Sequence, residues 1–427
     1  MLKEKVKFAS NFITILLLLA ILFAYAMFQG GFVSWFLFYS FLPIFLYQML
    51  FLLYPWKKWK ITRKISSPII HSGGDITVIL HLERKFPFPL HYLIVEEVFP
   101  SSLHRYDFGQ KKYQWMNQEN RVDREMKTVI FPWFRRKLKV SYTMKHIPRG
   151  EHKLNVVRIK TGDVFGLVKK ECFFSVENSL IAYPSTLPVQ LQHISLRYDT
   201  GNKLAAMKAV SNSNIVGGVR DYAPGDRFSW IDWKQTAKKN SMMTKEFEQE
   251  RNADALIVLN NCGKGLENAN AYEATVEMTL TLLEKMAKES QEASFLSVGG
   301  AGEIAYFPKN RSRTLNKGIQ KYLTNVYPAN GESFGEQLKK VSAKLSQSNL
   351  VILITTNIDP YLAETLEQTM TNANQVGLIL IQGKKMLTDD VRSHIEQLKR
   401  LGAGVCILTE QQLVRNPIEV TFYETVH

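Results

Sequence analysis

The sequence predicts a multidomain protein with two N-terminal transmembrane helices, an antiparallel β-sandwich and a C-terminal α/β domain. Three observations carry this prediction: a long uncharged apolar run, a series of short segments of alternating polarity, and a later alternation of apolar strands with amphipathic helices. The chain has 427 residues, of which 45% are hydrophobic and 22% charged, so its composition is globular rather than disordered. We expect a transmembrane hairpin over residues 1–56, a β-sandwich over 57–185, a connector over 186–252 and an α/β domain over 253–427.

An uncharged run from Phe8 to Trp56 marks the membrane segment. Its 49 residues contain no Asp, Glu, Lys or Arg. A helix needs about 20 apolar residues to cross a bilayer, so the run predicts two spans, near 8–28 and 32–54, with a turn at Gly30-Gly31. One alternative is a cleaved signal peptide, but its apolar region would be only about 7 to 15 residues long. Two buried helices of a soluble domain are the other alternative.

Basic residues flank both ends of the predicted hairpin, and none lies at its tip. They are Lys3, Lys5, Lys7, Lys57, Lys58, Lys60, Arg63 and Lys64. Because the basic flanks of membrane helices stay in the cytoplasm, both ends of the hairpin are predicted to be cytoplasmic. This makes the chain a multi-pass protein of the cell membrane with its soluble domains inside the cell.

The positive charge of the chain is concentrated beside the membrane. The whole chain has a formal net charge of +15, and residues 57–185 hold 24 Lys and Arg against 12 Asp and Glu, whereas residues 186–427 hold 27 against 26. A basic domain beside an anionic leaflet gains about 1 kcal/mol per well-placed Lys or Arg. The competing interpretation is a nucleic-acid surface, but no recognition-helix or stacking-platform pattern is present, so no specific nucleic acid is expected.

Short segments of alternating polarity predict the β-sandwich. The strand candidates are Asp75–Leu82, His91–Val98, Arg136–Met144 and His152–Lys160. In the third, apolar and polar residues alternate with period two, as in a half-buried strand. Proline and glycine separate the segments, which is typical of an antiparallel sandwich.

The last part of the chain alternates strands and helices. The expected strands are Ala255–Asn260, Ala293–Val298, Glu303–Phe307, Asn349–Thr356, Val376–Gln382 and Gly404–Leu408. Helical spacing of apolar residues follows over 272–287, near 360–373 and near 388–400. This alternation predicts a mostly parallel sheet covered by helices on both faces. Ligands bind such sheets at the carboxyl ends of the strands, here Asn260–Gly265 and Thr355–Asp359.

Three cysteines, Cys172, Cys262 and Cys406, lie far apart and form no CxxC or Cys/His spacing. A disulfide framework and a structural zinc site are therefore not expected, and the thiols are predicted to be reduced.

Residues 217–251, with the sequence GGVRDYAPGDRFSWIDWKQTAKKNSMMTKEFEQER, resemble the signature of the bacterial domain of unknown function 58 family. The matching positions are Gly218, Arg220, Tyr222, Gly225, Asp226, Ile231, Asp232, Trp233, Lys234, Ala237, Lys245, Glu246, Phe247 and Glu248. Upstream, residues 149–170 and 181–185 resemble the end of the family's sandwich, with Val164 in place of a proline. The resemblance covers nearly the whole chain.

The resemblance implies a von Willebrand factor A-like C-terminal domain. Such domains often bind Mg²⁺ through D-x-S-x-S after the first strand, a Thr, and an Asp after a later strand. Here the corresponding positions are Asn260, Cys262, Lys264 and Thr355 or Thr356. A cationic and a thiol side chain without a carboxylate should bind divalent cations poorly, so we expect no metal and no cofactor.

We expect the signature segment to be structural or to dock a partner, with no catalytic residue. The residues assigned to this role are Gly218, Arg220, Tyr222, Gly225, Asp226, Asp232, Trp233, Lys234, Lys245, Glu246 and Phe247. Tyr222 and Trp233 are expected to bury apolar area. Arg220 is expected to pair with Asp226 or Asp232. An acid/base cluster of Asp221, Asp226 and Asp232 with Lys234 and Arg220 is the alternative.

Three functions from different classes are compatible with these features. The first is a non-enzymatic membrane-anchored scaffold or adaptor whose A-like domain binds a protein partner; the resemblance implies an AAA+ ATPase of the MoxR type. The second is a metal-dependent enzyme or adhesion module, which would need an intact set of oxygen ligands. The third is an anionic-lipid or nucleic-acid binder that uses the basic β-domain. The sequence leaves the oligomeric state open.

The orientation is testable by thiol labelling of intact cells. A cysteine placed at Gly30 should react with a membrane-impermeant reagent added outside, because the hairpin tip is predicted to be external. A cysteine placed at Ser213 should not react. The reverse pattern would contradict the predicted orientation.

Overall fold

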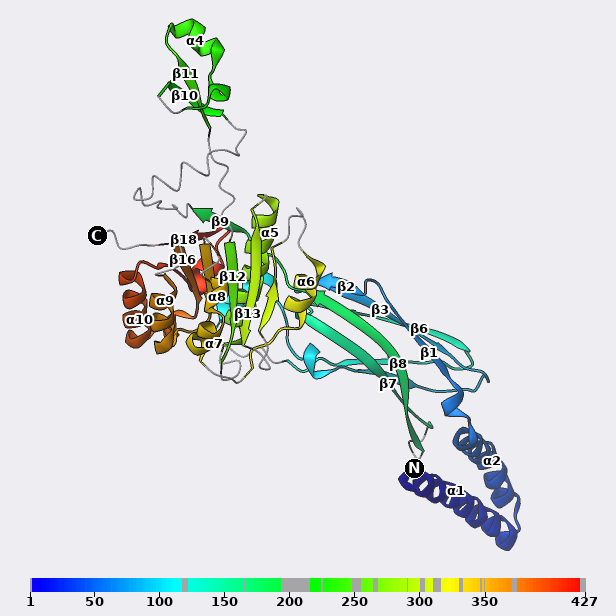
Figure 1. Cartoon of the computed structure of the whole chain (residues 1–427). Coiled ribbons are helices and arrows are strands. Elements are labelled where there is room, and N and C mark those ends of the chain that lie inside the picture. The colour runs from blue at the N-terminus through cyan, green and yellow to red at the C-terminus, as the bar shows by residue number, and fades with distance from the viewer. Residues whose placement is uncertain are drawn as a thin grey trace. The chain divides into compact units, whose positions relative to one another are not determined.

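The structure is a computed structural model of the chain (Figure 1). It describes residues 2–116, 122–164, 166, 168–192, 216–223, 226–247, 255–263, 268–289, 291–299, 304–309, 316–329, 333–345, 348, 350–370 and 375–422. The chain divides into two compact units. Unit 1 consists of Met1–Lys112, Gln118–Ser185 and Gln320–Asn325, and unit 2 of Tyr113–Asn117, Thr186–Ile319 and Val326–His427.

Unit 1 begins with two apolar helices, α1 (Leu2–Gln29) and α2 (Phe32–Leu53). Both are long and apolar enough to cross a membrane. At 1.5 Å per residue, the 22 residues of α2 extend about 33 Å, which matches a hydrocarbon core of about 30 Å. Gly30 has a φ of +61°, so the expected glycine turn separates the helices. Most of the large apolar side chains along both helices are exposed.

Two sheets make up the rest of unit 1. The first has the order β1-β3-β6 and consists of Lys60–Ile65, Ile76–Glu83 and Lys137–Met144, all antiparallel. The second has the order β2-β8-β7-β4-β5 and consists of Ile69–His71, Lys169–Tyr183, Gly150–Gly162, Leu93–Val98 and Met126–Ile130. Its pairs are antiparallel except for β2 with β8.

Both sheets contribute to the same two hydrophobic clusters. The first cluster includes Leu80 of β3 and Val157 of β7, and the second includes Ile76 of β3 and Leu180 of β8. These side chains are at most 2% exposed. Full burial of one such side chain contributes about 1.5–3 kcal/mol, so the two clusters supply much of the stability of unit 1.

The C-terminal turns of α2 belong to the first cluster. Phe51 and Leu52 are buried there together with Trp56 and Trp59, which follow the helix. Trp56 donates from Nε1 to the carbonyl of Phe51 at 3.3 Å. The helices and the two sheets therefore form one compact unit, whereas the sequence suggests a separate segment over residues 1–56.

The longest strand, β8, has no counterpart among the predicted strands. Its core side includes Cys172, Phe174 and Val176, which pack against the first cluster. Phe173 lies between them and is 63% exposed. An exposed aromatic ring at this position disguises the alternation of polarity on which strand prediction depends.

One buried ion pair connects the two sheets of unit 1. Arg63 of β1 and Glu97 of β4 form a salt bridge with fully buried side chains, and the hydroxyl of Tyr142 donates to the same carboxylate at 2.8 Å. Arg63 also donates to the carbonyls of Leu154 and Val176 at 2.7 and 2.5 Å. Burial, and then the charge of Glu97, raise the pKa of Tyr142 far above its usual value. The ion pair and these hydrogen bonds offset much of the cost of removing two charges from water.

Unit 2 contains a six-stranded sheet with the order β14-β13-β12-β15-β16-β17. Its strands in chain order are Ala255–Asn261, Ala293–Gly299, Ala305–Phe307, Leu350–Thr355, Gln375–Ile381 and Gly404–Leu408, which are β12 to β17. All pairs are parallel except β13 with β14. The six predicted strands of this domain are all present in the sheet.

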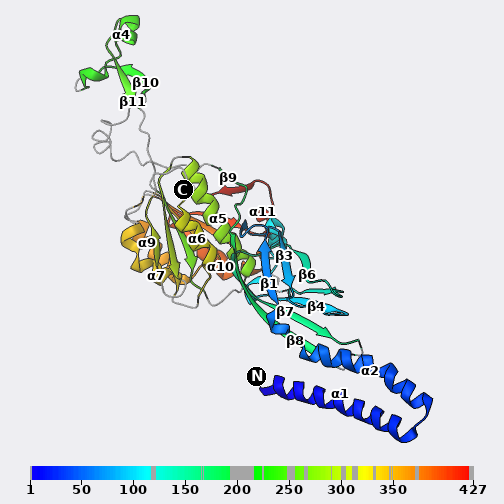
Figure 2. The same cartoon turned by 90° about the vertical axis from the view of Figure 1, so that its right-hand side faces the viewer.

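Helices cover both faces of this sheet (Figure 2). Helices α7, α9 and α10, over Phe334–Lys340, Pro360–Met370 and Asp389–Arg400, bury their apolar sides in one cluster with the sheet. Helix α5, over Ala269–Lys288, contacts β12, β13, β15 and β16 and lies outside that cluster. Unit 2 also contains the short helices α8 (Ser342–Leu345) and α11 (Glu410–Leu413), whereas α6 (Lys317–Asn325) is divided between the units, since Gln320–Asn325 belongs to unit 1.

A further strand pair lies in a segment for which the sequence predicts only a connector. Strand β9 (Val189–Gln192) pairs in parallel with β18 (Ile418–Thr421). The two strands are more than 200 residues apart in the sequence, so no local pattern indicates that they pair. Residues 193–215 of the expected connector lie outside the described part of the chain.

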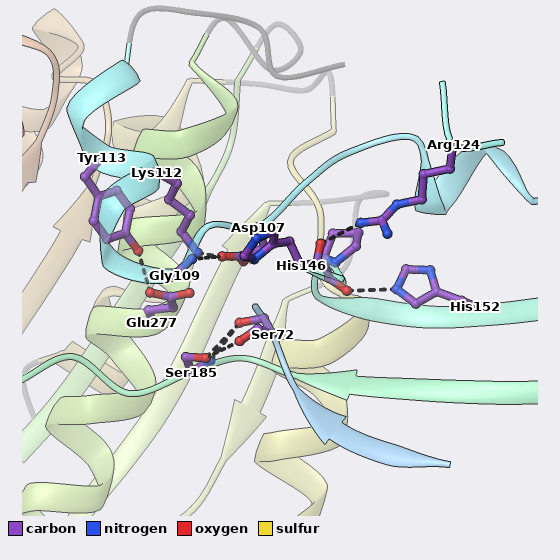
Figure 3. A network of polar contacts seen from close by, with 11 residues as sticks. Ser72, Asp107, Gly109, Lys112, Tyr113, Arg124, His146, His152, Ser185 and Glu277 are labelled. Carbon is purple, nitrogen blue, oxygen red and sulfur yellow. Dashed lines mark hydrogen bonds and ion pairs between the residues drawn. The ribbon is translucent and has the colours of Figure 1, made fainter. Parts of the chain in front are cut away.

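Several buried polar side chains in each unit are ion-paired or hydrogen-bonded (Figure 3). In unit 1, Asp107 accepts from Lys112 Nζ and from the backbone of Gly109, both at 2.8 Å. In unit 2, the hydroxyl of Tyr113 donates to the carboxylate of Glu277. Such pairing offsets the desolvation of groups that are rarely fully buried.

His152 of β7 is fully buried in unit 1 and hydrogen-bonded at both ring nitrogens. Its Nε2 lies 2.8 Å from the carbonyl of Pro148, and its Nδ1 lies 2.9 Å from the hydroxyl of Ser102. A carbonyl only accepts, so Nε2 carries the proton and Nδ1 accepts from Ser102. Burial, with the nearby charge of Arg124, lowers the pKa of His152 below its ordinary value.

The folded state binds a proton at His152 less readily than the unfolded state does. The contribution of neutral His152 to the free energy of unfolding is therefore fully present above the ordinary histidine pKa of about 6.5 and is lost as the pH falls below that value. We expect the melting temperature of the detergent-solubilised chain to fall between pH 7.5 and pH 5.5. His152→Gln, which stays neutral, should reduce this fall. His91→Gln, at an exposed position, is the matched control and should keep the wild-type fall. An unchanged pH dependence in His152→Gln would contradict this assignment.

Candidate functional site

The described residues of the signature segment, which end at Phe247, fold into a small hairpin. It consists of β10 (Val216–Asp221), a 3₁₀ turn (Phe228–Trp230), α4 (Trp233–Lys239) and β11 (Met243–Phe247). The two strands are antiparallel, with Gly218 opposite Glu246, and the register shifts between residues 216 and 218. We call these residues, 216–247, the signature hairpin.

Arg220 pairs with Asp226. Its two terminal nitrogens donate to the two carboxylate oxygens at 2.9 and 2.7 Å, and the backbone of Ala223 donates to the same carboxylate at 3.0 Å. These hydrogen bonds, that of Arg220 first, hold the pKa of Asp226 below its usual value. The bidentate pair closes the turn between β10 and the 3₁₀ turn, so the carboxylate is a structural acceptor.

Asp232 caps a helix instead of pairing with an arginine. It is the N-cap of α4, where its side chain accepts from the backbone of Lys234 and Gln235, both at 3.1 Å. An aspartate is strongly preferred at this position because it satisfies backbone donors that have no helical partner. Asn240 ends the helix with a φ of +55°. Asp226 and Asp232 are thus engaged by different partners in separate local structures.

Two large aromatic side chains of the signature hairpin are exposed. Trp233 is 65% exposed and Phe228 is 70% exposed. The expectation that Trp233 is buried is therefore wrong. The reason is local: α4 has only seven residues and none of them is buried, while Ile231 and Met243 take the interior positions. Tyr222 is half-buried, with its ring 6.4 Å from that of Phe228.

The other predicted residues of the signature differ in burial and in whether the structure describes them. Lys234 is exposed and Lys245 is half-buried in β11, opposite Val219. Glu246 and Phe247 lie in β11 by their backbone. Gly225 lies outside the described residues.

A second polar cluster lies at the carboxyl ends of β12 and β15 in unit 2. Strand β12 is flanked by β13 and β15, so the chain reverses its direction across the sheet at this point, where ligands bind in sheets of this kind. Asn260 donates from Nδ2 to the hydroxyl of Thr355 at 2.8 Å and accepts from the backbone of Cys262 at 2.7 Å. The hydroxyl of Thr355 donates in turn to the carbonyl of Asn357 at 2.6 Å.

Two residues that the sequence did not indicate as site residues, Ser297 and Tyr272, extend this cluster. Asn261 donates to the hydroxyl of Ser297 and accepts from the hydroxyl of Tyr272 at 2.7 Å. Both asparagines are nearly or fully buried. Two consecutive asparagines at the end of an otherwise apolar strand were the available signal, but the side-chain partner of Asn260 comes from β15 and those of Asn261 come from β13 and α5. We call Asn260, Asn261, Ser297, Thr355 and Tyr272 the strand-end cluster.

Gly299 allows the close packing beside this cluster. Its φ is +91°, and a Cβ there would lie 2.5 Å from Cys262 Sγ and 2.7 Å from the backbone nitrogen of Cys262. Any other residue would clash with the chain that follows β12.

The strand-end cluster does not fit a divalent cation. Its amide and hydroxyl groups are engaged with one another, and Mg²⁺ is usually bound through carboxylates. Among the described residues, no group of three or more His, Cys, Asp or Glu side chains is placed to hold a metal ion. Thr356 is half-buried beside the cluster, and Lys264 lies outside the described part of the chain.

Comparison with known proteins identifies the family. The family described as Protein of unknown function DUF58 matches residues 218–395. The chain is 36% identical to the Uncharacterized protein YeaD of Bacillus subtilis (strain 168) over 287 residues, which cover 67% of this chain and 68% of that protein. The chain belongs to the DUF58 family. The DUF58 match begins at Gly218 in the signature hairpin and ends at Ile395 in α10, so it includes both polar sites.

Two solved structures show weaker likeness to this DUF58 chain. The PilB minor pilin from Streptococcus sanguinis is 9% identical, with a TM-score of 0.30, over 76% of this chain and 85% of the pilin. BslA, a bacterial hydrophobin, is 11% identical, with a TM-score of 0.15, over 27% of this chain and 98% of BslA. TM-scores this low carry no argument about fold or function.

The strand-end cluster generates a prediction about metal ions. Calorimetric titration of the detergent-solubilised chain with Mg²⁺ or Mn²⁺ should show no saturable site below millimolar concentrations, because the polar groups at this position are satisfied internally. A stoichiometric micromolar site that is lost in Asn260→Ala would contradict the prediction. Asn178→Ala in unit 1 is a control that should not change the titration.

Proposed function

We propose that this DUF58 protein is a membrane-anchored, non-enzymatic scaffold whose soluble units face the cytoplasm and dock a protein partner through the signature hairpin. The hairpin formed by α1 and α2 would be the anchor, crossing the bilayer twice. The basic residues on both flanks of these helices support the cytoplasmic orientation.

We further propose that the two sheets of unit 1 are a β-sandwich and that unit 2 is a von Willebrand factor A-like domain. The two clusters shared between the sheets support the first assignment. The parallel sheet with one antiparallel edge strand, covered by helices on both faces, supports the second.

The exposure of two large aromatic rings on the signature hairpin carries the docking proposal. Phe228 and Trp233 are 70% and 65% exposed, although the hairpin around them is held by the Arg220–Asp226 pair and the Asp232 cap. Aromatic residues on an ordered backbone are the residues most often responsible for binding energy at protein interfaces. A catalytic role is less well supported, because the two carboxylates are engaged by an arginine and by a helix N-terminus.

The chemical character of the partner follows from the same surface. It should offer an apolar pocket for the two rings and acidic groups for the surrounding basic residues Lys234, Lys238 and Lys239, which are exposed. The family resemblance implies a MoxR-type AAA+ ATPase as this partner.

The docking proposal is testable by crosslinking in native membranes. The double variant Phe228→Ala/Trp233→Ala should lower capture of an AAA+ ATPase at least about tenfold, since truncating an interface hot spot costs about 2 kcal/mol or more. Its melting curve should stay close to that of the wild type because both rings are exposed. Phe173→Ala, which removes a 63% exposed ring from unit 1, is the matched control and should keep full capture. Undiminished capture by the double variant would contradict the proposal.

A further inference from the structure

We propose that two loops of unit 1, residues 84–92 and 131–136, insert into the headgroup region of the bilayer that α1 and α2 cross and bind anionic phospholipid there. We call them the membrane loops. The inference rests on the membrane anchoring proposed above and is independent of the partner of the signature hairpin.

Strand register places both loops at the end of the sheets where the chain arrives from α2. Lys60, the first residue of β1, lies opposite Glu83, the last residue of β3, and Glu83 lies opposite Lys137, the first residue of β6. In the second sheet, β4 begins at Leu93 opposite Ile130, the last residue of β5. The segments between these strand ends are the membrane loops.

Hydrogen bonds to α2 set the depth of the first loop. The hydroxyl of Tyr54 donates to the carbonyl of Phe86 at 2.7 Å, and the hydroxyl of Tyr47 donates to the carbonyl of Pro89 at 2.9 Å. Tyr47 lies six residues before Leu53, the end of α2, which is about 9 Å along a helix. If α2 crosses the bilayer, the first loop must reach the boundary between headgroups and acyl chains, since the headgroup layer on each side is about 5–8 Å thick.

The neighbouring strand turn reaches the same depth. Gln48 donates from Nε2 to the carboxylate of Asp163 at 3.1 Å, one residue after β7 ends. Figure 2 shows β7 and β8 extending to α2. The sheets therefore contact α2 from more than one strand end, so the position of the loops is fixed by several contacts.

The second loop is joined to the first by backbone hydrogen bonds. Trp133 donates to the carbonyl of Leu90 at 3.0 Å and accepts from the backbone of Leu90 at 3.3 Å. Arg84, which is buried, donates to the carbonyl of Trp133 at 2.9 Å. The two loops thus share one surface.

The side chains on this surface suit the interface of a membrane. Phe86, Phe131, Trp133 and Phe134 are 48%, 63%, 53% and 62% exposed, although loops at a water-exposed end of a sheet are usually polar. Aromatic rings of this kind are enriched where headgroups meet acyl chains. The apolar residues Phe88 and Leu90 of the first loop are buried instead, so the exposed rings are not simply part of a poorly packed core.

The charges on this surface select an anionic lipid. Lys85, Arg135, Arg136 and the adjoining Lys137 are exposed, and neither loop contains an acidic residue. Lys137 has a distant carboxylate, that of Glu83 at 3.8 Å, and Arg136 donates to the carbonyl of Lys85 at 2.6 Å. In an anionic leaflet the phosphates lie outside the acyl chains. The exposed rings could therefore contact the acyl chains while the bordering cations contact the phosphates.

The test uses the full chain in nanodiscs that contain phosphatidylglycerol, with a single environment-sensitive fluorophore on a cysteine and the three natural cysteines replaced. A probe at Phe134→Cys should show blue-shifted emission and be quenched by nitroxide-labelled lipid. A probe at Ser101→Cys, at the opposite end of the same sheet, should behave as in water. A probe at Leu42→Cys, in the middle of α2, reports whether the anchor crosses the bilayer.

Each outcome decides between the proposals. Quenching at residues 42 and 134 but not at 101 supports membrane insertion of the loops. Quenching at 42 alone overturns it while leaving the anchor intact, and no quenching at 42 overturns the membrane anchor itself. In Arg135→Gln/Arg136→Gln, or in nanodiscs of phosphatidylcholine alone, quenching at 134 should fall at least twofold; an unchanged signal would overturn the assignment of headgroup binding to these arginines.

A second measurement needs no substitution. A water-soluble amine reagent should modify Lys85 and Lys137 of the wild-type chain at least fivefold more slowly in phosphatidylglycerol nanodiscs than in detergent. Lys153 is exposed near the other end of β7 and should react equally in both. Equal reactivity of Lys85 in the two environments would overturn the proposal.

Discussion

The organisation of unit 1 depends on an apolar contact that continues from the end of α2 into the core of the β-sheets. Phe51 and Leu52 complete the helix and are buried in the same cluster as Leu80 and Val157. The cluster is built from both elements, so neither buries its apolar surface without the other. Because the end of α2 is packed in this cluster, strand β1, which follows it, begins beside the helices. The pairing of β1 with β3 and of β3 with β6 then determines which loops lie at the same end of the sheet.

Buried polar groups add specificity to this apolar framework. Arg124 donates to the carbonyls of Leu103, Lys145, Arg105 and His146 at 2.6 to 3.0 Å, which joins loops that are distant in sequence. In unit 2, the strand-end cluster occupies with neutral hydrogen bonds the position where a parallel sheet often binds a ligand. Removing one partner of such a network leaves a buried group unsatisfied, so these groups specify one arrangement of the chain.

The two surfaces to which we assign binding by proposal share one structural feature. Exposed aromatic rings occur on both the membrane loops and the signature hairpin, and in both places the backbone is held by hydrogen bonds. Ordered loops with exposed aromatic side chains lose little entropy on binding, which favours recognition of a surface over chemistry in a pocket.

The sequence by itself determined the elements whose signals are local. An uncharged apolar run is sufficient to predict α1 and α2, period-two alternation predicts β6, and continuous apolar runs predict the strands of the parallel sheet. The same holds for the family, because the signature of residues 217–251 is contiguous. Only the tertiary structure decided the features that depend on distant partners: the pairing of β9 with β18, the choice of Asp226 for Arg220, the hydrogen bonds of Asn261 and the exposure of Trp233. A side chain's partner and its burial depend on which strands and helices pack beside it, and that information is distributed over the whole chain rather than carried by its neighbours in sequence.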